Sequence, residues 1–128
     1  MIPEDLRYTE EHAWVAHEGD FYVVGITDFA QQQLGEVTYV ELPELDTEVD
    51  PHDEVAVVES VKAACDVYAP VGGTVVEIND GLEDEPDLIN HDPYGDGWIF
   101  KLENVSADKV RGLMNAASYA AYLEKEAG

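Results

Sequence analysis

Residues 54–70 read Glu54-Val55-Ala56-Val57-Val58-Glu59-Ser60-Val61-Lys62-Ala63-Ala64-Cys65-Asp66-Val67-Tyr68-Ala69-Pro70 and carry the strongest structural signal in the chain. The β-branched run from Val55 to Val61 fits a half-buried strand, and Val67 and Tyr68 resume that pattern after small residues. Pro70 ends the second segment because proline cannot continue a sheet ladder. The pattern predicts a hairpin with Lys62 near its tip.

Lys62 is the only lysine between Met1 and Ile99. A lysine at a hairpin tip, with small Ala63 beside it, is accessible to an enzyme that modifies side-chain amines. The plain alternative is a turn lysine that serves solubility in an unmodified β-domain. A single lysine in so strongly acidic a chain weakens this alternative without excluding it.

Segments of the hairpin and of the rest of the chain resemble one family. Residues 59–63 (Glu-Ser-Val-Lys-Ala) and 66–70 (Asp-Val-Tyr-Ala-Pro) are similar to the lipoyl-attachment hairpin of glycine cleavage system H proteins. Residues 8–15 (Tyr-Thr-Glu-Glu-His-Ala-Trp-Val), 25–35 (Gly-Ile-Thr-Asp-Phe-Ala-Gln-Gln-Gln-Leu-Gly) and 92–98 (Asp-Pro-Tyr-Gly-Asp-Gly-Trp) resemble the same family in the same order. The hairpin alone would indicate a lipoyl or biotinyl carrier, and the other segments make the match specific.

The resemblance implies a function for Lys62. The lysine would carry lipoate in amide linkage and take an aminomethyl group from glycine decarboxylase (P protein) to an aminomethyltransferase (T protein). Dihydrolipoamide dehydrogenase (L protein) would then reoxidise the dithiol. Glu59 and Asp66 flank the lysine and are candidate contacts for the lipoate-attaching enzyme or for the loaded arm. The chemistry belongs to the cofactor, so the chain is expected to be a non-catalytic carrier.

Other carrier classes fit less well. A biotin carrier would place methionines beside the lysine, where this chain has Val61 and Ala63. A lipoyl domain of a 2-oxo-acid dehydrogenase acyltransferase would need a linker and a catalytic domain. Two readings stay open beside the main one: an H-like donor that relays lipoyl groups to other complexes, and a structural β-domain with an unmodified lysine.

Length and charge limit the remaining possibilities. The 128 residues suit one domain, 1–128. Twenty-nine acidic against six basic residues give a net charge of −23, which argues against nucleic acid or an anionic membrane as a partner. Acidity of this kind can steer a carrier to basic patches on enzymes or reflect a saline cytoplasm. No segment predicts a membrane span or a leader, so a cytoplasmic monomer is expected.

The secondary-structure pattern predicts many short strands with helices at the end. Ala13–Glu18 and Phe21–Ile26 form a predicted hairpin around Gly19-Asp20. Thr27 or Asp28 caps a short helix through Leu34, which Gly35 closes in the left-handed conformation. Further predicted strands are 36–41, whose buried face the pattern leaves open, 73–78 and 98–103. The acidic segment 79–87 is predicted as a surface loop with a helical turn.

Residues 106–126 are predicted to form a C-terminal helical cover. Val110, Leu113 and Met114 are placed on one helix face, and a second helix from Asn115 would bury Tyr119 with Tyr122 or Leu123. The predicted fold class is mostly β, a flattened barrel or sandwich. The resemblance implies the same, a lipoyl/biotinyl-type barrel-sandwich hybrid with a short internal helix and C-terminal helices.

The lone cysteine and the histidines do not form a recognisable catalytic or metal site. Cys65 shares strand parity with Val67, which predicts an inward thiol that packs as a small hydrophobe. One cysteine allows no internal disulfide. The four histidines, His12, His17, His52 and His91, have no metal-binding spacing, so no metal is predicted. A structural hydrogen bond is expected for His12.

Two positions depart from the family pattern. Ala13 stands where relatives usually have glutamate between histidine and tryptophan, and Phe29 stands where they can have histidine. In the family these polar side chains belong to the cleft that holds the loaded arm. A cationic amine in a cleft needs a carboxylate nearby. The departures therefore predict a looser hold, with Asp66 as the remaining partner.

Overall fold

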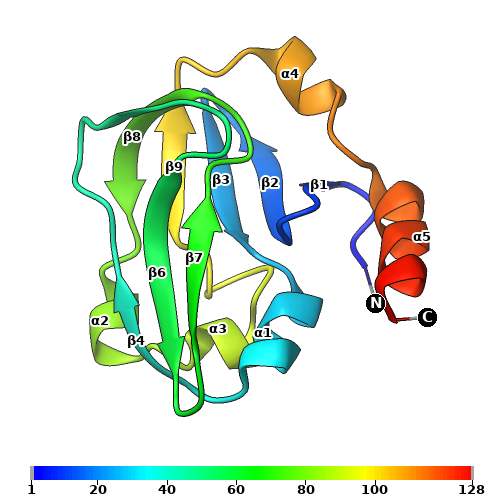
Figure 1. Cartoon of the computed structure of the whole chain (residues 1–128). Coiled ribbons are helices and arrows are strands. Elements are labelled where there is room, and N and C mark those ends of the chain that lie inside the picture. The colour runs from blue at the N-terminus through cyan, green and yellow to red at the C-terminus, as the bar shows by residue number, and fades with distance from the viewer. Residues whose placement is uncertain (1, 128) are drawn as a thin grey trace.

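The computed structural model describes residues 2–127, whose strands form two separate antiparallel sheets (Figure 1). The larger sheet has the order β1 (Arg7–Tyr8), β2 (Ala13–Glu18), β3 (Phe21–Ile26), β9 (Phe100–Glu103), β8 (Gly73–Ile78) and β5 (Glu48–Val49). The smaller has the order β4 (Val37–Glu41), β6 (Glu54–Ser60) and β7 (Ala64–Tyr68). The two sheets face each other without closing, which confirms the predicted mostly-β sandwich.

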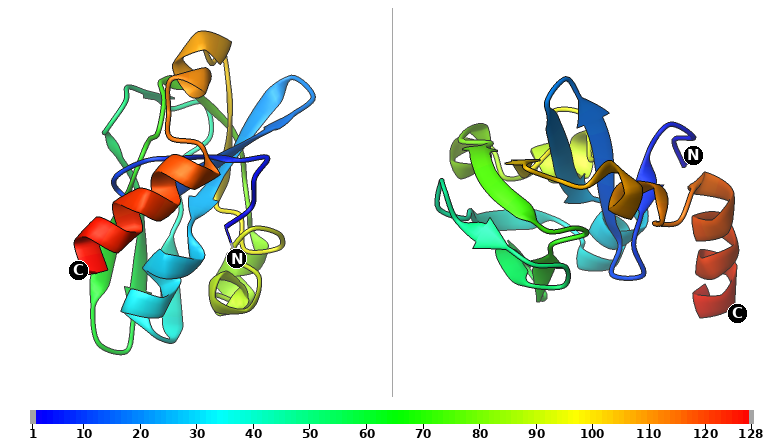
Figure 2. Two further views of the ribbon diagram at one scale, coloured as in Figure 1. Left: turned by 90° about the vertical axis from the view of Figure 1, so that its right-hand side faces the viewer. Right: turned by 90° about the horizontal axis from the view of Figure 1, so that it is seen from above.

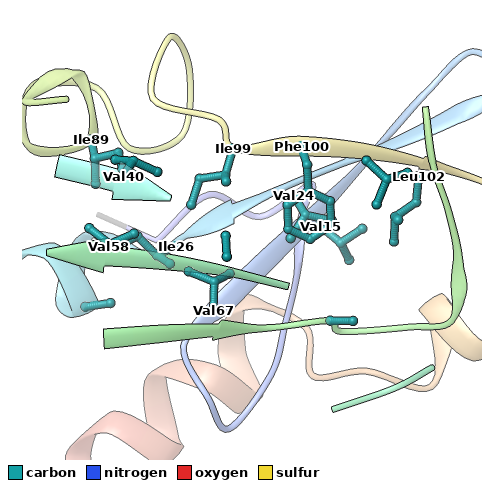
Figure 3. Close-up of a cluster of buried hydrophobic side chains, with 14 of the residues drawn as sticks. Val15, Val24, Ile26, Val40, Val58, Val67, Ile89, Ile99, Phe100 and Leu102 are labelled. Carbon is teal, nitrogen blue, oxygen red and sulfur yellow. The ribbon is translucent and has the colours of Figure 1, made fainter. Parts of the chain in front are cut away.

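The main core lies between the two sheets (Figure 3). Successive side chains of a strand point to opposite faces, so alternate residues of each strand line this interior. Val24 and Phe100 from the larger sheet meet Val58 and Val67 from the smaller, and all four are almost fully buried. Burying each such side chain contributes roughly 1.5–3 kcal/mol. This core holds the lysine hairpin against the rest of the molecule.

Both predicted hairpins are confirmed. The β2–β3 turn is formed by Gly19-Asp20, and Gly19 has a φ of 61°. The β6–β7 hairpin pairs Glu59 with Ala64 and leaves residues 61–63 as its tip. Figure 1 shows this tip projecting beyond both sheets at the end of the molecule where α1 lies.

Strand β4 begins one residue later than predicted, at Val37, and its buried face is now defined. Val37 and Val40 are buried, whereas Thr38 and Tyr39 are exposed. The pairing with β6 shifts register between Val37 and Tyr39. A bulge of this kind interrupts the alternation of faces, which is why the sequence pattern left the buried face open.

The short internal helix α1 (Asp28–Leu34) is confirmed with its predicted cap. The Ala30 N–H donates to Oγ1 of Thr27 at 3.3 Å, and the Gly35 N–H donates to the Gln31 carbonyl at 3.0 Å. The conformation predicted for Gly35 is wrong in detail. Its φ of 79° and ψ of −154° lie outside the left-handed helical region, in a region that only glycine adopts readily.

Segment 79–87, predicted as a surface loop with a helical turn, and the four residues after it contain more helix than predicted. They form two short helices, α2 (Gly81–Asp84) and α3 (Leu88–His91). Leu82 and Ile89 are fully buried and belong to the main core. The helical turn predicted within 79–87 is confirmed as α2, but the surface placement is wrong for Leu82, because an isolated apolar residue in an acidic segment carries no periodic signal. Strand β9 likewise begins at Phe100, two residues later than predicted.

The predicted C-terminal cover consists of α4 (Ala107–Arg111) and α5 (Ala116–Ala127). The shared helix face predicted for Val110, Leu113 and Met114 is wrong, because α4 ends at Arg111. Val110 and Leu113 pack on the main core, whereas Met114 exchanges two backbone hydrogen bonds with Tyr8. Within residues 2–127, no helix is long and apolar enough to cross a membrane.

A second hydrophobic cluster fixes α5 on the outer face of the larger sheet. Its buried members are Leu6, Tyr8, Trp14, Val23 and Tyr119. The rings of Tyr8 and Tyr119 stack with centroids 4.7 Å apart, and Tyr122 and Leu123 pack partly buried against the cluster. The predicted burial of Tyr119 is thus confirmed. The left view of Figure 2 shows α5 (orange to red) running toward the end of the molecule that carries α1 and the hairpin tip.

Candidate functional site

The main chain of the hairpin tip is tightly organised around Ser60. The Ser60 N–H donates to the Ala63 carbonyl at 2.8 Å, and Oγ of Ser60 accepts from the N–H groups of Lys62 and Ala63 at 3.3 and 3.1 Å. The Val61 N–H donates to the Glu36 carbonyl at 3.2 Å, which ties the tip to the chain after α1. The side chain of Lys62 is exposed. A fixed backbone therefore presents one free primary amine.

The C-terminal end of α1 lies beside that amine. A methyl group on Gly35 would stand 3.4 Å from Cε and 3.9 Å from Nζ of Lys62. Nδ2 of Asn90 donates to the Gly35 carbonyl and to Oε1 of Gln31, both at 2.8 Å, and its Oδ1 accepts from the Val37 N–H at 2.8 Å. Sequence reasoning missed Asn90, since its partners are more than 50 residues away in the sequence.

Glu59 and Asp66 lie on the outward face of the hairpin. Val58 pairs with Cys65 and points inward, so the neighbouring pairs, which contain Glu59 and Asp66, point away from the core. Both acids are therefore close to Lys62 along the strands and point away from the core; Glu59 is exposed and Asp66 is half-buried. This position suits contact with another protein better than contact with an arm folded onto the carrier.

A cavity of about 630 Å³ opens next to the hairpin. It lies where α1, the hairpin, the segment before β2 and the end of α5 come together. One part of its wall is apolar and the other part carries charged groups. Its lining residues are Glu11, His12, Ile26, Phe29, Ala30, Gln33, Leu34, Ala63, Cys65 and Glu126.

His12 organises the polar part of the cavity. Its Nε2 lies 3.1 Å from Oε2 of Glu126, and its Nδ1 lies 2.9 Å from the Tyr119 hydroxyl. That hydroxyl is 2.7 Å from Oγ1 of Thr27, a fully buried residue. Burial raises the pKa of Tyr119, so the phenol keeps its proton at neutral pH. The hydrogen bond expected for His12 is confirmed, and it connects the cavity to α5.

The two positions that depart from the family pattern, Ala13 and Phe29, are placed differently relative to the cavity. Ala13 is 1 % exposed and is absent from the described cavity lining, whereas Phe29 lines the cavity, with its ring centroid 4.8 Å from that of His12. Asp66, predicted as the remaining carboxylate of the cleft, is absent from the described cavity lining, and its contact with a loaded arm stays a prediction. The cavity has carboxylates from Glu11 and Glu126, which lie 115 residues apart in the sequence and share no local motif.

Cys65 is half-buried, packs against the main core and borders the cavity. Its inward orientation agrees with the predicted parity, although burial is incomplete. Burial raises the pKa of the Cys65 thiol, and nearby Asp66 raises it further. The thiol is the form present at neutral pH, and the thiol is a poor nucleophile.

Alkylation of Cys65 should therefore be slow. At pH 7.5 we expect iodoacetamide to modify the native protein about tenfold more slowly than the urea-unfolded protein, with a rate that rises as pH approaches the raised pKa. Quenched time points followed by intact mass give both rates. Equal rates in the folded and unfolded protein would show a freely reactive thiol.

The other histidines lie apart from one another. His17 stacks on Tyr22, His52 pairs with Glu11 at 2.9 Å, and His91 pairs at 3.3 Å with Asp87, the residue just before its helix. Among residues 2–127, no group of three or more His, Cys, Asp or Glu side chains is arranged to hold a metal ion.

The segments quoted above from different parts of the sequence meet around the start of α1. Nε1 of Trp14 donates to the Pro93 carbonyl at 2.9 Å, and the Asp28 N–H donates to the Tyr94 hydroxyl at 3.0 Å. A methyl group on Gly25 would stand 2.8 Å from the Trp14 ring, so only glycine fits there. These contacts support the helix that borders the lysine and the cavity.

A lysine on a projecting hairpin of a two-sheet β fold, with a cavity beside it, defines a carrier domain of the lipoyl and biotinyl type. Comparison with known proteins narrows the class. The family described as glycine cleavage H-protein matches residues 6–126. The chain belongs to the glycine cleavage H-protein family.

Individual relatives agree with this assignment. A glycine cleavage system H protein of Pseudoalteromonas atlantica is 52 % identical over 126 residues, which cover 98 % of each chain. One of Thermus thermophilus is also 52 % identical, with the same coverage. The crystal structure of a glycine cleavage system H protein from Mycobacterium marinum matches with a TM-score of 0.85 and 35 % identity, over 96 % of this chain and 99 % of that one.

Proposed function

We propose that this chain is the lipoyl carrier of a glycine cleavage system and that lipoate is attached in amide linkage to Nζ of Lys62. The proposal rests on the contrast between the fixed backbone of the hairpin tip and the exposed side chain of Lys62. The backbone of residues 60–63 is held by hydrogen bonds, while the Lys62 side chain is exposed beside Gly35 and the next residue, Ala63, lines the cavity. A group attached there would swing about a fixed point and could fold back onto the carrier.

The residues around the cavity fit a lipoyl group. Ile26, Phe29 and Leu34 offer apolar contacts suited to an aliphatic chain and a dithiolane ring. Gly35 has no side chain to block the path from Lys62. When bound, lipoate supplies a disulfide that accepts the aminomethyl group. The chain's own residues would shelter that cargo from water.

Partner enzymes follow from this function. We propose that the carrier meets glycine decarboxylase, an aminomethyltransferase, dihydrolipoamide dehydrogenase and a lipoate-attaching enzyme, and that it has no catalytic step of its own. Glu59 and Asp66, which lie on the outward face of the hairpin beside Lys62, are proposed as recognition acids for the attaching enzyme. The bacterial relatives support a cytoplasmic location, and we propose that the carrier acts as a monomer. The charge of −23 supports docking to basic protein surfaces rather than to nucleic acid or membrane.

Intact mass of the protein from a lipoate-competent host tests the attachment. We expect the mass to exceed that of the bare chain by one lipoyl group in amide linkage, with fragment ions that place the group on Lys62. Protein from a host that can neither make nor take up lipoate should have the bare mass. An unmodified protein from the competent host, or lipoate on Lys101, Lys109 or Lys125, would refute the proposal.

A further inference from the structure

The side-chain amide of Asn90 joins the end of α1 to the start of β4, next to the hairpin tip. Asn90 lies on α3, which packs beside α1 (Figure 1). Its Nδ2 donates to the Gly35 carbonyl and to Oε1 of Gln31, and its Oδ1 accepts from the Val37 N–H, all at 2.8 Å. Both amide hydrogens and the amide oxygen are therefore used, which fixes the orientation of the side chain.

These hydrogen bonds lie where regular secondary structure is interrupted. Gly35 follows the last residue of α1, and its φ of 79° and ψ of −154° do not continue the helix. Val37 begins β4, and the pairing of β4 with β6 shifts register directly after it. The Gly35 carbonyl and the Val37 N–H bind the same side chain from either side of Glu36. Asn90 thus holds the connection between α1 and β4 in place.

The orientation of one peptide group links Asn90 to the hairpin tip. The Glu36 carbonyl and the Val37 N–H belong to the same planar trans peptide and point in opposite directions, so an oriented N–H also orients the carbonyl. Asn90 binds the N–H, and the Glu36 carbonyl accepts from the Val61 N–H at 3.2 Å. Among residues 2–127, this is the hydrogen bond that joins residues 61–63 to the chain outside the hairpin.

We propose that Asn90 is a positioning residue for the attachment of lipoate: through the peptide group between residues 36 and 37, it holds the hairpin tip where the attaching enzyme binds it. This inference rests on the proposed function. The neutral amine of Lys62 attacks the carboxyl carbon of lipoyl adenylate, a mixed anhydride. The C–N bond forms, the bond from that carbon to the phosphate oxygen breaks, AMP leaves, and the nitrogen loses one proton.

A tip that is ordered before binding favours this reaction through entropy. The attaching enzyme must align the amine with the carboxyl carbon, and a mobile tip would lose backbone freedom at that moment. The loss falls on binding, because a tip that is already bound has the same geometry in either case. Asn90 itself takes no part in the bond changes.

The other polar residues near the tip have different roles. Oγ of Ser60 accepts from the N–H groups of Lys62 and Ala63, so it shapes the tip internally without placing it relative to α1. Gln31 binds the side chains of Asn90 and Asp28. Asn90 is therefore the side chain that connects the helical end of the molecule to the position of the tip.

The kinetics of lipoate attachment to Asn90→Ala test the inference. Unmodified full-length protein is incubated with a lipoate-attaching ligase, ATP and lipoate at a series of carrier concentrations, and intact mass gives the rate. We expect the KM for the carrier to rise about tenfold, as the loss of backbone order in about one residue implies, and kcat to change by less than about twofold. Asn90→Leu removes the same hydrogen bonds but fills the space, and it takes the place of Asn90→Ala if that variant does not fold.

Ile89→Val is the matched control. Ile89 is the preceding residue of α3 and is fully buried, so the loss of a methyl group lowers the stability of the fold without removing a hydrogen bond of Asn90. We expect an unchanged KM from this variant. Urea unfolding of both variants shows whether their losses of global stability are comparable.

Hydrogen exchange of the Val61 N–H gives a readout that is independent of the attaching enzyme. We expect this amide to exchange about tenfold faster in Asn90→Ala than in the unsubstituted protein, because the hydrogen bond to Glu36 opens more often. Ile89→Val should leave its exchange rate unchanged. The Ile99 N–H, which donates to the Val24 carbonyl at 2.9 Å, is the reference for the core in each protein.

The outcomes separate this inference from the proposed function. If the unsubstituted protein accepts no lipoate, both fail. If it is lipoylated and the Asn90 variants keep its KM and its Val61 exchange rate, only the role of Asn90 is overturned. A raised KM with unchanged Val61 exchange would also overturn positioning, since Asn90 would then act by another route. An equal rise of KM in Ile89→Val would assign the effect to global stability.

Discussion

Replacement of Lys62 by arginine should abolish carrier activity and leave the fold unchanged. Arginine keeps the positive charge, but its guanidinium cannot form the lipoyl amide. The hydrogen bonds that shape the tip use Oγ of Ser60 and backbone groups, and the Lys62 side chain is exposed. A surface change of this kind alters the free energy of unfolding by no more than about 0.5 kcal/mol. Glycine decarboxylation with purified partner enzymes measures the activity, and thermal unfolding measures the fold.

Lys109→Arg is the matched control for this substitution. Lys109 is also exposed, but it lies on α4 rather than at the hairpin tip. We expect full lipoylation and full activity from this variant. Lipoate found on Lys62→Arg by intact mass would show that another residue accepts the cofactor and would contradict the assignment.

Salt should stabilise this protein strongly. In the described structure the carboxylates that pair with Lys or Arg are Glu18, Glu77 and Asp108, so most of the 29 acids lack a cationic partner. At 0.01 M ionic strength the screening length is about 30 Å, comparable to the molecule, and it falls to about 3 Å at 1 M. We expect the midpoint of thermal unfolding to rise by about 10 °C over this range of potassium chloride.

A variant with fewer charges separates screening from other effects of salt. Glu44, Glu85 and Glu124 are exposed, and their joint replacement by glutamine lowers the net negative charge without touching the core. The midpoint of this variant should be higher at low salt and should rise less with added salt. A midpoint that stays flat or falls in the unsubstituted protein would exclude self-repulsion as a major factor. An equal slope in both proteins would point to general salt exclusion instead.

Local sequence signals predicted the parts of the fold that depend on neighbouring residues. The Gly19-Asp20 turn, the Thr27 cap and the Lys62 hairpin each follow from a few adjacent residues, and each is confirmed. Where the local sequence pattern failed to predict the structure, contacts between residues far apart in the sequence determine it. Leu82 and Ile89 are buried because α2 and α3 pack on the core, which no local period records.

The candidate site was only partly predictable for the same reason. Lys62 is identified by its hairpin and by the resemblance of its flanking residues to a family. The cavity needs Glu11 and His12 from the start of the chain and Glu126 from its end, and these meet only because α5 packs on Tyr8 and Trp14. The family pattern pointed instead to positions 13 and 66, of which position 13 has alanine in this chain and the contact of Asp66 with a loaded arm stays a prediction.

The fixed hairpin tip also determines how cargo is shared between the carrier and its partners. The Val61 N–H donates to the Glu36 carbonyl, so an arm on Lys62 has a fixed pivot. Because the arm is tethered beside the cavity, its free end has a high effective concentration there. The cavity and the active site of a docked enzyme then compete for one tethered group. If the cavity holds the arm about 90 % of the time, the apparent affinity of an enzyme for the free arm falls about tenfold. A docked partner would overcome this competition most directly by displacing the end of α5, which carries one wall of the cavity.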